Sequence, residues 1–230
     1  MKNSLIIDFL KDLKENNSKE WFEKNKTRYE LVKNSYYEFA KAILKTMKKY
    51  DSTLEGVDVK NCLFRINKDV RFSKDKSPYK TSLGIILTPF GKKMQLAGYY
   101  IHLEDGQCFT GGGLYMPPHD MVKKIRNEII TFPDDFIKIV RNKKFIKTYN
   151  DLNKSPLFML IKYPKGIDIS NPIADYTLLK SFTTSKSFSN EDIDKEDFIS
   201  KCTSDLLSLK DFIHFLNRGL MSDEHGGYYN

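Results

Sequence analysis

Three side chains capable of acid–base chemistry alternate along residues 98–104. Tyr100, His102 and Glu104 occupy every second position of this stretch. If it is a β-strand, its period of two places a phenol, an imidazole and a carboxylate on one face. Such a row can act as a general acid and base. We therefore predict His102 and Glu104 as catalytic residues and Tyr100 as a ligand-binding residue.

Two alternative roles fit the same spacing. A hydrogen-bonded histidine on a half-buried strand face is the commonest reason for such a pattern. Two of the side chains could also form half of a metal site, but no third ligand stands out nearby. We therefore predict no metal site.

A second cluster is rich in positive charge. Residues 60–93 contain two acids and nine basic residues, a net charge of +7, while the whole chain carries +8. The basic residues are Lys60, Arg65, Lys68, Arg71, Lys74, Lys76, Lys80, Lys92 and Lys93. Such a local field attracts phosphate, carboxylate or nucleic acid. A solvated, lysine-rich loop accounts for the composition equally well.

Alternation within this stretch could aim several polar groups in one direction. Arg65, Asn67, Asp69 and Arg71 share strand parity, so an unbroken strand would project them from one face over about 20 Å. Two arginines could hold an oxyanion while Asp69, a third catalytic candidate, fixes a guanidinium. A surface ladder of ion pairs is the alternative. The predicted ligand-binding residues of the stretch are Arg65, Arg71, Lys76, Tyr79 and Lys80.

Three successive glycines at 111–113 form a third motif. Glycines weaken a strand unless the backbone must bend or approach another group closely. Exposed amides there could receive a phosphate oxygen, so Gly112 is a further ligand-binding candidate. The segment lacks the Lys-Ser/Thr of a P-loop, and a bulge or sheet corner is the favoured interpretation.

These motifs need elements to position them, and the apolar spacing predicts those elements. Periods of three and four predict a helix near residues 4–13 and a long helix from the capping signal at 17–20 to about Lys49. Alternation then predicts strands at 62–72, 82–88, 94–103 and 107–113, with a loop at 73–81. Downstream we expect helices from about Met121, from Pro133 and at 172–179, a strand at 181–188, and one final helix capped at 189–192.

The predicted fold class is α+β, with an antiparallel, meander-like sheet from the central region covered by N-terminal and C-terminal helices. A length of 230 residues fits one domain, which we place at residues 1–225, followed by a frayed tail at 226–230. The absence of an apolar run of about 20 residues argues against a membrane partner. Three widely spaced cysteines predict neither disulfides nor a zinc site, and the default location is the cytoplasm. No cofactor motif is recognised, so we predict no cofactor.

The motifs resemble the family known as domain of unknown function 2461. The matching pieces are FLKDLKENNSKEWFEKNKTRYE, FRINKDVRFSKDKSPYKTSLG, GYYIHLEDGQCFTGGGLYMP and Leu179-Lys180-Ser181-Phe182. The chain departs from the family pattern near Lys186, where that pattern favours arginine. The resemblance implies a single compact domain of about this length, and it implies no particular activity.

Two functions from different classes fit these residues. The first is an enzyme or receptor for a small anionic or phosphorylated ligand, bound by the Arg/Lys cluster beside the Tyr/His/Glu row. The second is a nucleic-acid-binding module that uses residues 60–93. A domain that docks an acidic protein partner is a third possibility. We favour the first, because Asp69, His102 and Glu104 serve acid–base chemistry better than contact with a phosphate backbone.

Overall fold

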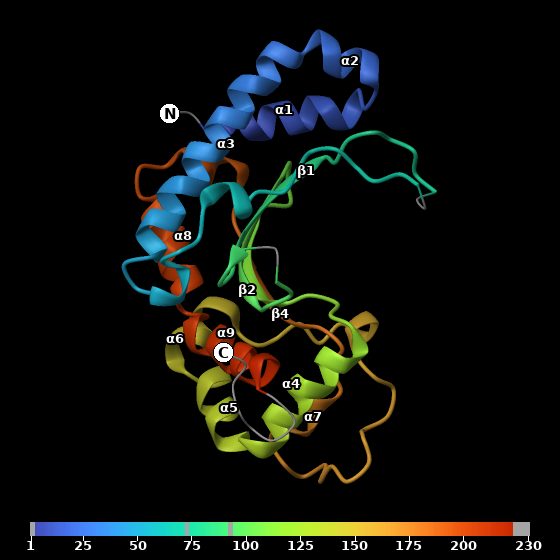
Figure 1. The fold of residues 1–230 in the computed structure, drawn as a ribbon, viewed down its shortest axis with the longest axis vertical. Coiled ribbons are helices and arrows are strands. Elements are labelled where there is room, and N and C mark those ends of the chain that lie inside the picture. Colours follow the sequence, from blue (N-terminus) through green and yellow to red (C-terminus); the bar gives the residue numbers. More distant parts are fainter. Residues whose placement is uncertain (1–2, 72–73, 92–93, 223–230) are drawn as a thin grey trace. The chain divides into compact units, whose positions relative to one another are not determined.

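A computed structural model gives the fold of the chain (Figure 1). It describes residues 3–71, 74–91 and 94–222. The strands are β1 (Ser82–Leu87), β2 (Gly98–Glu104), β3 (Phe109–Leu114) and β4 (Phe182–Ser187). The helices are α1 (Ser4–Glu15), α2 (Lys19–Lys24), α3 (Lys26–Met47), α4 (His119–Thr131), α5 (Pro133–Val140), α6 (Lys143–Tyr149), α7 (Ala174–Thr177), α8 (Phe198–Leu207) and α9 (Lys210–Met221). Short 3-10 turns lie at Ser52–Leu54, Val59–Asn61, Pro156–Phe158 and Asn190–Asp194.

The strands form one antiparallel sheet in the order β1-β2-β3-β4. Each strand pairs with the next one in the sequence, which is the meander that the sequence predicts. Helices precede and follow the strands along the chain, and the sheet is antiparallel, so the α+β class is confirmed. Within the described ranges, every helix is too short or too polar to cross a lipid bilayer.

The described chain divides into two compact units. Unit 1 comprises Met1–Lys93, Tyr100–Thr110 and Ser187–Ser204, and unit 2 comprises Met94–Tyr99, Gly111–Lys186 and Asp205–Asn230. Contact-defined units are not necessarily independent folding domains. The expectation of one domain over residues 1–225 therefore stays a prediction, and the expected frayed tail at 226–230 lies outside the described residues.

Unit 1 has a core of apolar helix faces. Helix α1 buries Phe9 and Leu10, and it packs along α3, which buries Phe39 and Ile43. The edge of the contact carries an ion pair, 2.6 Å long, between Asp12 and Arg28. Burial of these amphipathic faces, rather than helix propensity, stabilises helices of this length.

The expected long helix from residue 18 to about Lys49 is wrong in one respect, because it is broken at Asn25. Ser18 caps α2 and accepts a hydrogen bond from the Trp21 amide at 3.2 Å, as the capping signal predicts. Asn25 leaves the helical region at φ −103° and ψ 13°, and its side chain donates to the Trp21 carbonyl at 2.9 Å. An asparagine side chain competes in this way with backbone hydrogen bonds, which ends α2.

The predicted strand at 62–72 is also wrong over its described residues, 62–71. In its place the chain follows an irregular course, and we call residues 62–71 and 74–80 the two legs of the arm (Figure 1). Isolated antiparallel bridges join Leu63 of the first leg to Ile85 of β1, and Asn67 of the first leg to Tyr79 of the second. Three residues lie between Leu63 and Asn67, and five lie between Tyr79 and Ile85. This unequal spacing shifts the register, so a regular ladder cannot form between the bridges.

Unit 2 is built around the contact between α4 and α9. At this contact the Glu128 carboxylate pairs with Arg218, whose guanidinium lies 4.5 Å from the Phe132 ring centroid. Pro133 opens α5 as predicted. The expected single final helix is wrong, since a 3-10 turn at Asn190–Asp194 precedes α8, and α9 begins only at Lys210. Ser208 follows α8 and donates its hydroxyl to the Asp205 carbonyl at 2.6 Å, which competes with continuation of the helix.

The glycines of β3 allow a close approach of neighbouring backbone. A Cβ at Gly113, where φ is +116°, would lie 1.9 Å from the Phe182 carbonyl oxygen of β4. We expect Gly113→Ala to lower the free energy of unfolding by at least about 2 kcal/mol, through clash and backbone strain. Urea unfolding measures this, with Gly56→Ala as control because a Cβ at Gly56 meets nothing within 4 Å. Equal midpoints for the two variants would refute the close approach.

Candidate functional site

The predicted row of polar side chains lies on one face of β2. The strand buries Tyr99, Ile101 and Leu103 and leaves the alternate positions partly exposed. The side chains of His102 and Glu104 are 17% and 19% exposed. These values leave the two groups accessible to solvent while removing most of the water that would weaken their interaction.

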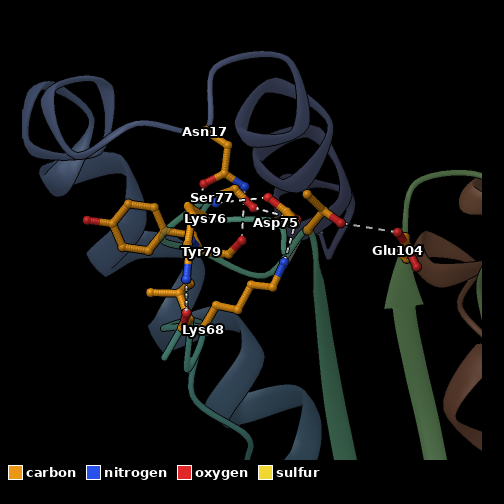
Figure 2. Close-up of polar contacts among 9 residues, drawn as sticks. Asn17, Lys68, Asp75, Lys76, Ser77, Tyr79 and Glu104 are labelled. Carbon is orange, nitrogen blue, oxygen red and sulfur yellow. Dashed lines mark hydrogen bonds and ion pairs between the residues drawn. The ribbon is translucent and has the colours of Figure 1, made fainter. Parts of the chain in front are cut away.

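A continuous chain of hydrogen bonds joins the row. The Tyr100 hydroxyl lies 3.2 Å from His102 Nδ1, and His102 Nε2 lies 3.0 Å from Glu104 Oε2. The Thr81 hydroxyl donates to Glu104 Oε1 at 3.2 Å. Figure 2 labels Glu104 at the end of β2 and marks this bond with a dashed line. With Glu104 as the acceptor, the ring hydrogen of His102 lies on Nε2, and Nδ1 is left to accept from the Tyr100 hydroxyl.

Aromatic rings and a glycine hold this chain in place. The Phe109 ring stacks on the His102 imidazole with centroids 4.8 Å apart and planes 15° apart. The Phe64 ring meets the Tyr100 ring edge-on at 6.4 Å. Beneath Tyr100, a Cβ at Gly84 would lie only 2.4 Å from the phenol oxygen. The position of the phenol therefore depends on the missing side chain at Gly84.

Helix α3 secures the same point of β1. The Tyr36 hydroxyl donates to the Gly84 carbonyl, which also accepts from the Phe64 amide at 3.2 Å. These two bonds fix the first leg of the arm against β1 and so place Phe64 beside Tyr100. Sequence pattern alone gives no signal for this contact, because Tyr36 and Gly84 are 48 residues apart.

Burial raises the pKa of the Tyr100 phenol, and the nearby negative charge of Glu104 raises it further. The phenol therefore keeps its proton at neutral pH and can donate it. The phenol can therefore donate a proton, and the imidazole lone pair next to it can accept that proton.

Lys80 brings positive charge to the row. Its ammonium lies 5.8 Å from the centroid of the Phe64 ring, the ring that contacts Tyr100. In the described part of the chain, no carboxylate pairs with this ammonium. Its neighbour Thr81, the residue directly after the arm, bonds to Glu104, so the end of the arm and the residue after it supply a cation and a hydroxyl.

Several charges of the arm pair with one another. Asp69 holds the Arg71 guanidinium through two bonds of 3.0 and 2.7 Å, an arrangement that fits both the predicted fixing of a guanidinium and a surface ion pair. The bond from Arg71 lowers the pKa of Asp69. Lys68 pairs with Asp75 and lowers the pKa of that carboxyl, with help from Ser77, as Figure 2 shows. The predicted catalytic role of Asp69 stays a prediction.

Two other predicted ligand residues of the arm differ in accessibility. Tyr79 is buried, and its ring stacks on Phe22 with centroids 4.0 Å apart. Its backbone exchanges two hydrogen bonds with the Asn17 side chain, at 2.9 and 3.1 Å (Figure 2). Tyr79 therefore anchors the arm to the turn between α1 and α2. Arg65 is exposed, and it forms no ion pair with any described residue.

Lys76 and Gly112 complete the predicted set. The Lys76 ammonium donates to the Val70 carbonyl at 3.0 Å, which leaves its charge uncompensated. Gly112 belongs to unit 2, where a Cβ would lie 2.7 Å from the Gly98 carbonyl oxygen and 2.9 Å from Leu209 Cδ1. Packing against these neighbours accounts for that glycine without a ligand.

The sequence pattern did not indicate Thr81, Phe109 or Gly84 as parts of the site. The Asp105-Gly106 turn was the available signal for Phe109, because a tight turn fixes which residues of a hairpin face each other. Within the described ranges, no three His, Cys, Asp or Glu side chains gather closely enough to hold a metal ion.

Comparison with known proteins gives one match. The family model described as Conserved hypothetical protein (DUF2461) matches residues 5–215, which is nearly the whole chain. No curated protein and no solved structure matches this chain.

The raised pKa of Tyr100 predicts how stability changes in alkali. The unfolded phenol ionises near pH 10, and the folded one ionises higher. This contribution to stability is therefore complete below pH 10 and is lost as pH rises toward the folded pKa. We expect Tyr100→Phe to flatten the fall of the unfolding free energy above pH 10, measured by urea unfolding at each pH. Tyr115→Phe, which removes an exposed phenol, is the comparison, and parallel curves for wild type and Tyr100→Phe would contradict the assignment.

Proposed function

The chain therefore belongs to the family described as Conserved hypothetical protein (DUF2461), and we propose that it binds a small anionic or phosphorylated ligand at an acid–base site on the open face of β2. The observation that carries this proposal is the unbroken hydrogen-bond chain from Thr81 through Glu104 and His102 to Tyr100. A row of this kind supports an enzyme that moves a proton, or a receptor that reads the ligand's protonation state.

The imidazole of His102 is accessible and held in a fixed orientation. Its side chain keeps 17% of its surface exposed, so a small ligand can reach the row. Its imidazole is held from both nitrogens and from one ring face. Such a fixed orientation is what a proton-transfer group requires.

The charge near the row supports an anionic ligand. Lys80 lacks a carboxylate partner among the described residues, and its ammonium sits over the exposed Phe64 ring next to Tyr100. Arg65, in the first leg of the arm, is likewise without an ion pair in the described ranges. Lys68 and Arg71 are held by acids of the arm itself. We therefore propose Lys80 as the main anion-binding residue and Arg65 as the second one.

Phenyl phosphate is a suitable probe, because it joins an oxyanion to a ring that can contact Phe64. We expect Lys80→Met to weaken its binding at least about tenfold, since a bond to a charged group contributes roughly 1.5–3 kcal/mol. Isothermal titration calorimetry at low salt measures the change. Lys74→Met, from the same arm, should leave the affinity within about twofold. Equal losses for the two variants, or no loss, would exclude a specific role for Lys80.

The nucleic-acid alternative for residues 60–93 remains a prediction with a different signature. Binding along a phosphate backbone makes log K fall steeply with log salt, by about 0.7 for each phosphate of a single strand. We expect fluorescence anisotropy with a single-stranded oligonucleotide to show a slope shallower than about −2. Reversing the charge of Lys74 should then leave phenyl phosphate binding intact. A steep slope that this reversal flattens would favour the nucleic-acid function instead.

A further inference from the structure

The hydrogen-bond chain ends at the Tyr100 hydroxyl on one side and at the Thr81 hydroxyl on the other. Glu104 Oε1 is taken by Thr81, Glu104 Oε2 by His102 Nε2, and His102 Nδ1 by Tyr100. The Phe109 ring covers one face of the imidazole. The phenol oxygen of Tyr100 donates its hydrogen to His102, and its own lone pairs remain to accept another.

We propose that Tyr100 is the catalytic residue that exchanges a proton with the bound anion, with His102 as its general base and Glu104 as the carboxylate that orients the imidazole. This inference rests on the proposed function and assigns the roles within it. It also revises the expectation from the sequence, in which His102 faces the ligand and Tyr100 only lines the site. The ligand class is a small carboxylate or phosphate with an exchangeable proton at its reacting atom.

The proton step balances within the row. A ligand X–H bond breaks and its proton bonds to the Tyr100 oxygen, while the Tyr100 O–H bond breaks and that proton bonds to His102 Nδ1. The ligand keeps the electron pair of the broken bond as an anion, and the imidazolium is paired with Glu104 at 3.0 Å. The reverse step returns a proton to the ligand through the same phenol. A hydroxyl, an imidazole and a carboxylate in this order also activate the nucleophile of a Ser-His-Asp triad.

The surroundings of Tyr100 make this base necessary. Burial and the charge of Glu104 both disfavour a free phenolate. The groups that face the phenol include His102 on β2 and the Gly84 backbone on β1. The rings of Phe64, from the arm, and Phe109, from β3, also contact it. A second phenol, that of Tyr36 on α3, lies nearby, and its hydroxyl donates a hydrogen bond to the Gly84 carbonyl. Of these neighbours, His102 is the group with a lone pair suited to accept the Tyr100 proton.

Gly84 acts as a positioning residue for the same atom. A methyl group there would lie 2.4 Å from the phenol oxygen and 2.9 Å from two ring carbons. Gly84→Ala therefore moves the hydroxyl away from its place beside His102. Its φ lies outside the left-handed range, so alanine causes no backbone strain of its own.

The test is the reactivity of Tyr100 toward 4-(fluorosulfonyl)benzoate, an anionic sulfonyl fluoride. In this reaction an O–S bond forms, the S–F bond breaks, fluoride leaves, and the phenol proton passes to His102. Peptide mass spectrometry measures the labelling rate of each tyrosine. We expect Tyr100 to react about 100-fold faster than the exposed Tyr115, since a positioned base contributes roughly 10²–10⁴-fold.

Variants and pH separate the proposed base from a structural role. His102→Gln should slow labelling of Tyr100 about 100-fold, and Glu104→Gln about tenfold. Gly84→Ala should slow it while leaving Tyr115 unchanged. Above neutral pH the wild-type rate should rise less steeply with pH than the His102→Gln rate, which should keep rising until the phenol itself ionises. The wild-type comparison of Tyr100 with Tyr115 decides the question even if a variant fails to fold.

The outcomes distinguish this inference from the proposed function. If phenyl phosphate binds through Lys80 but Tyr100 reacts no faster than Tyr115, the role of Tyr100 is overturned and the anion site stands. If Tyr100 reacts fast with the anionic probe and equally fast with uncharged benzenesulfonyl fluoride, and phenyl phosphate does not compete, the activated phenol stands and the anion site is overturned.

Discussion

The alternation of burial along β2 is the constraint on which the candidate site depends. Tyr99, Ile101 and Leu103 face the core, and this fixes the opposite direction for the residues between them. A slip of one residue would expose three large apolar side chains and bury the imidazole and the carboxylate, at a cost of several kcal/mol. The hydrophobic core therefore sets the register that brings Tyr100, His102 and Glu104 into line.

Interactions outside β2 convert this alignment into a defined proton path. A row on an isolated strand would leave each side chain free to choose among rotamers. Stacking by Phe109 restricts the imidazole, Thr81 restricts the carboxylate, and the space above Gly84 restricts the phenol. The resulting order gives His102 and Glu104 one partner on each side, which is a condition for directed proton transfer.

Sequence reasoning reached the sheet and the row because both depend on local period. It predicted the meander and the facing of His102 with Glu104 from spacing alone. It missed the break at Asn25 and the register shift in the arm, because these depend on side-chain competition for backbone groups and on leg lengths between distant bridges. The roles of Gly84 and Thr81 could not be predicted either, because they arise from contacts with side chains of the neighbouring strand β2.

The arm determines where the positive charge of residues 60–93 lies relative to the acid–base row on β2. Its outer part neutralises two of its own cations, because Asp69 pairs with Arg71 and Asp75 pairs with Lys68. Its base is anchored by Tyr79, which stacks on Phe22. Lys80 and Thr81 follow directly after this anchor, so fixing Tyr79 also fixes the ammonium over Phe64 and the hydroxyl on Glu104. A net charge spread over residues 60–93 in the sequence thus yields one well-placed cation beside the acid–base row.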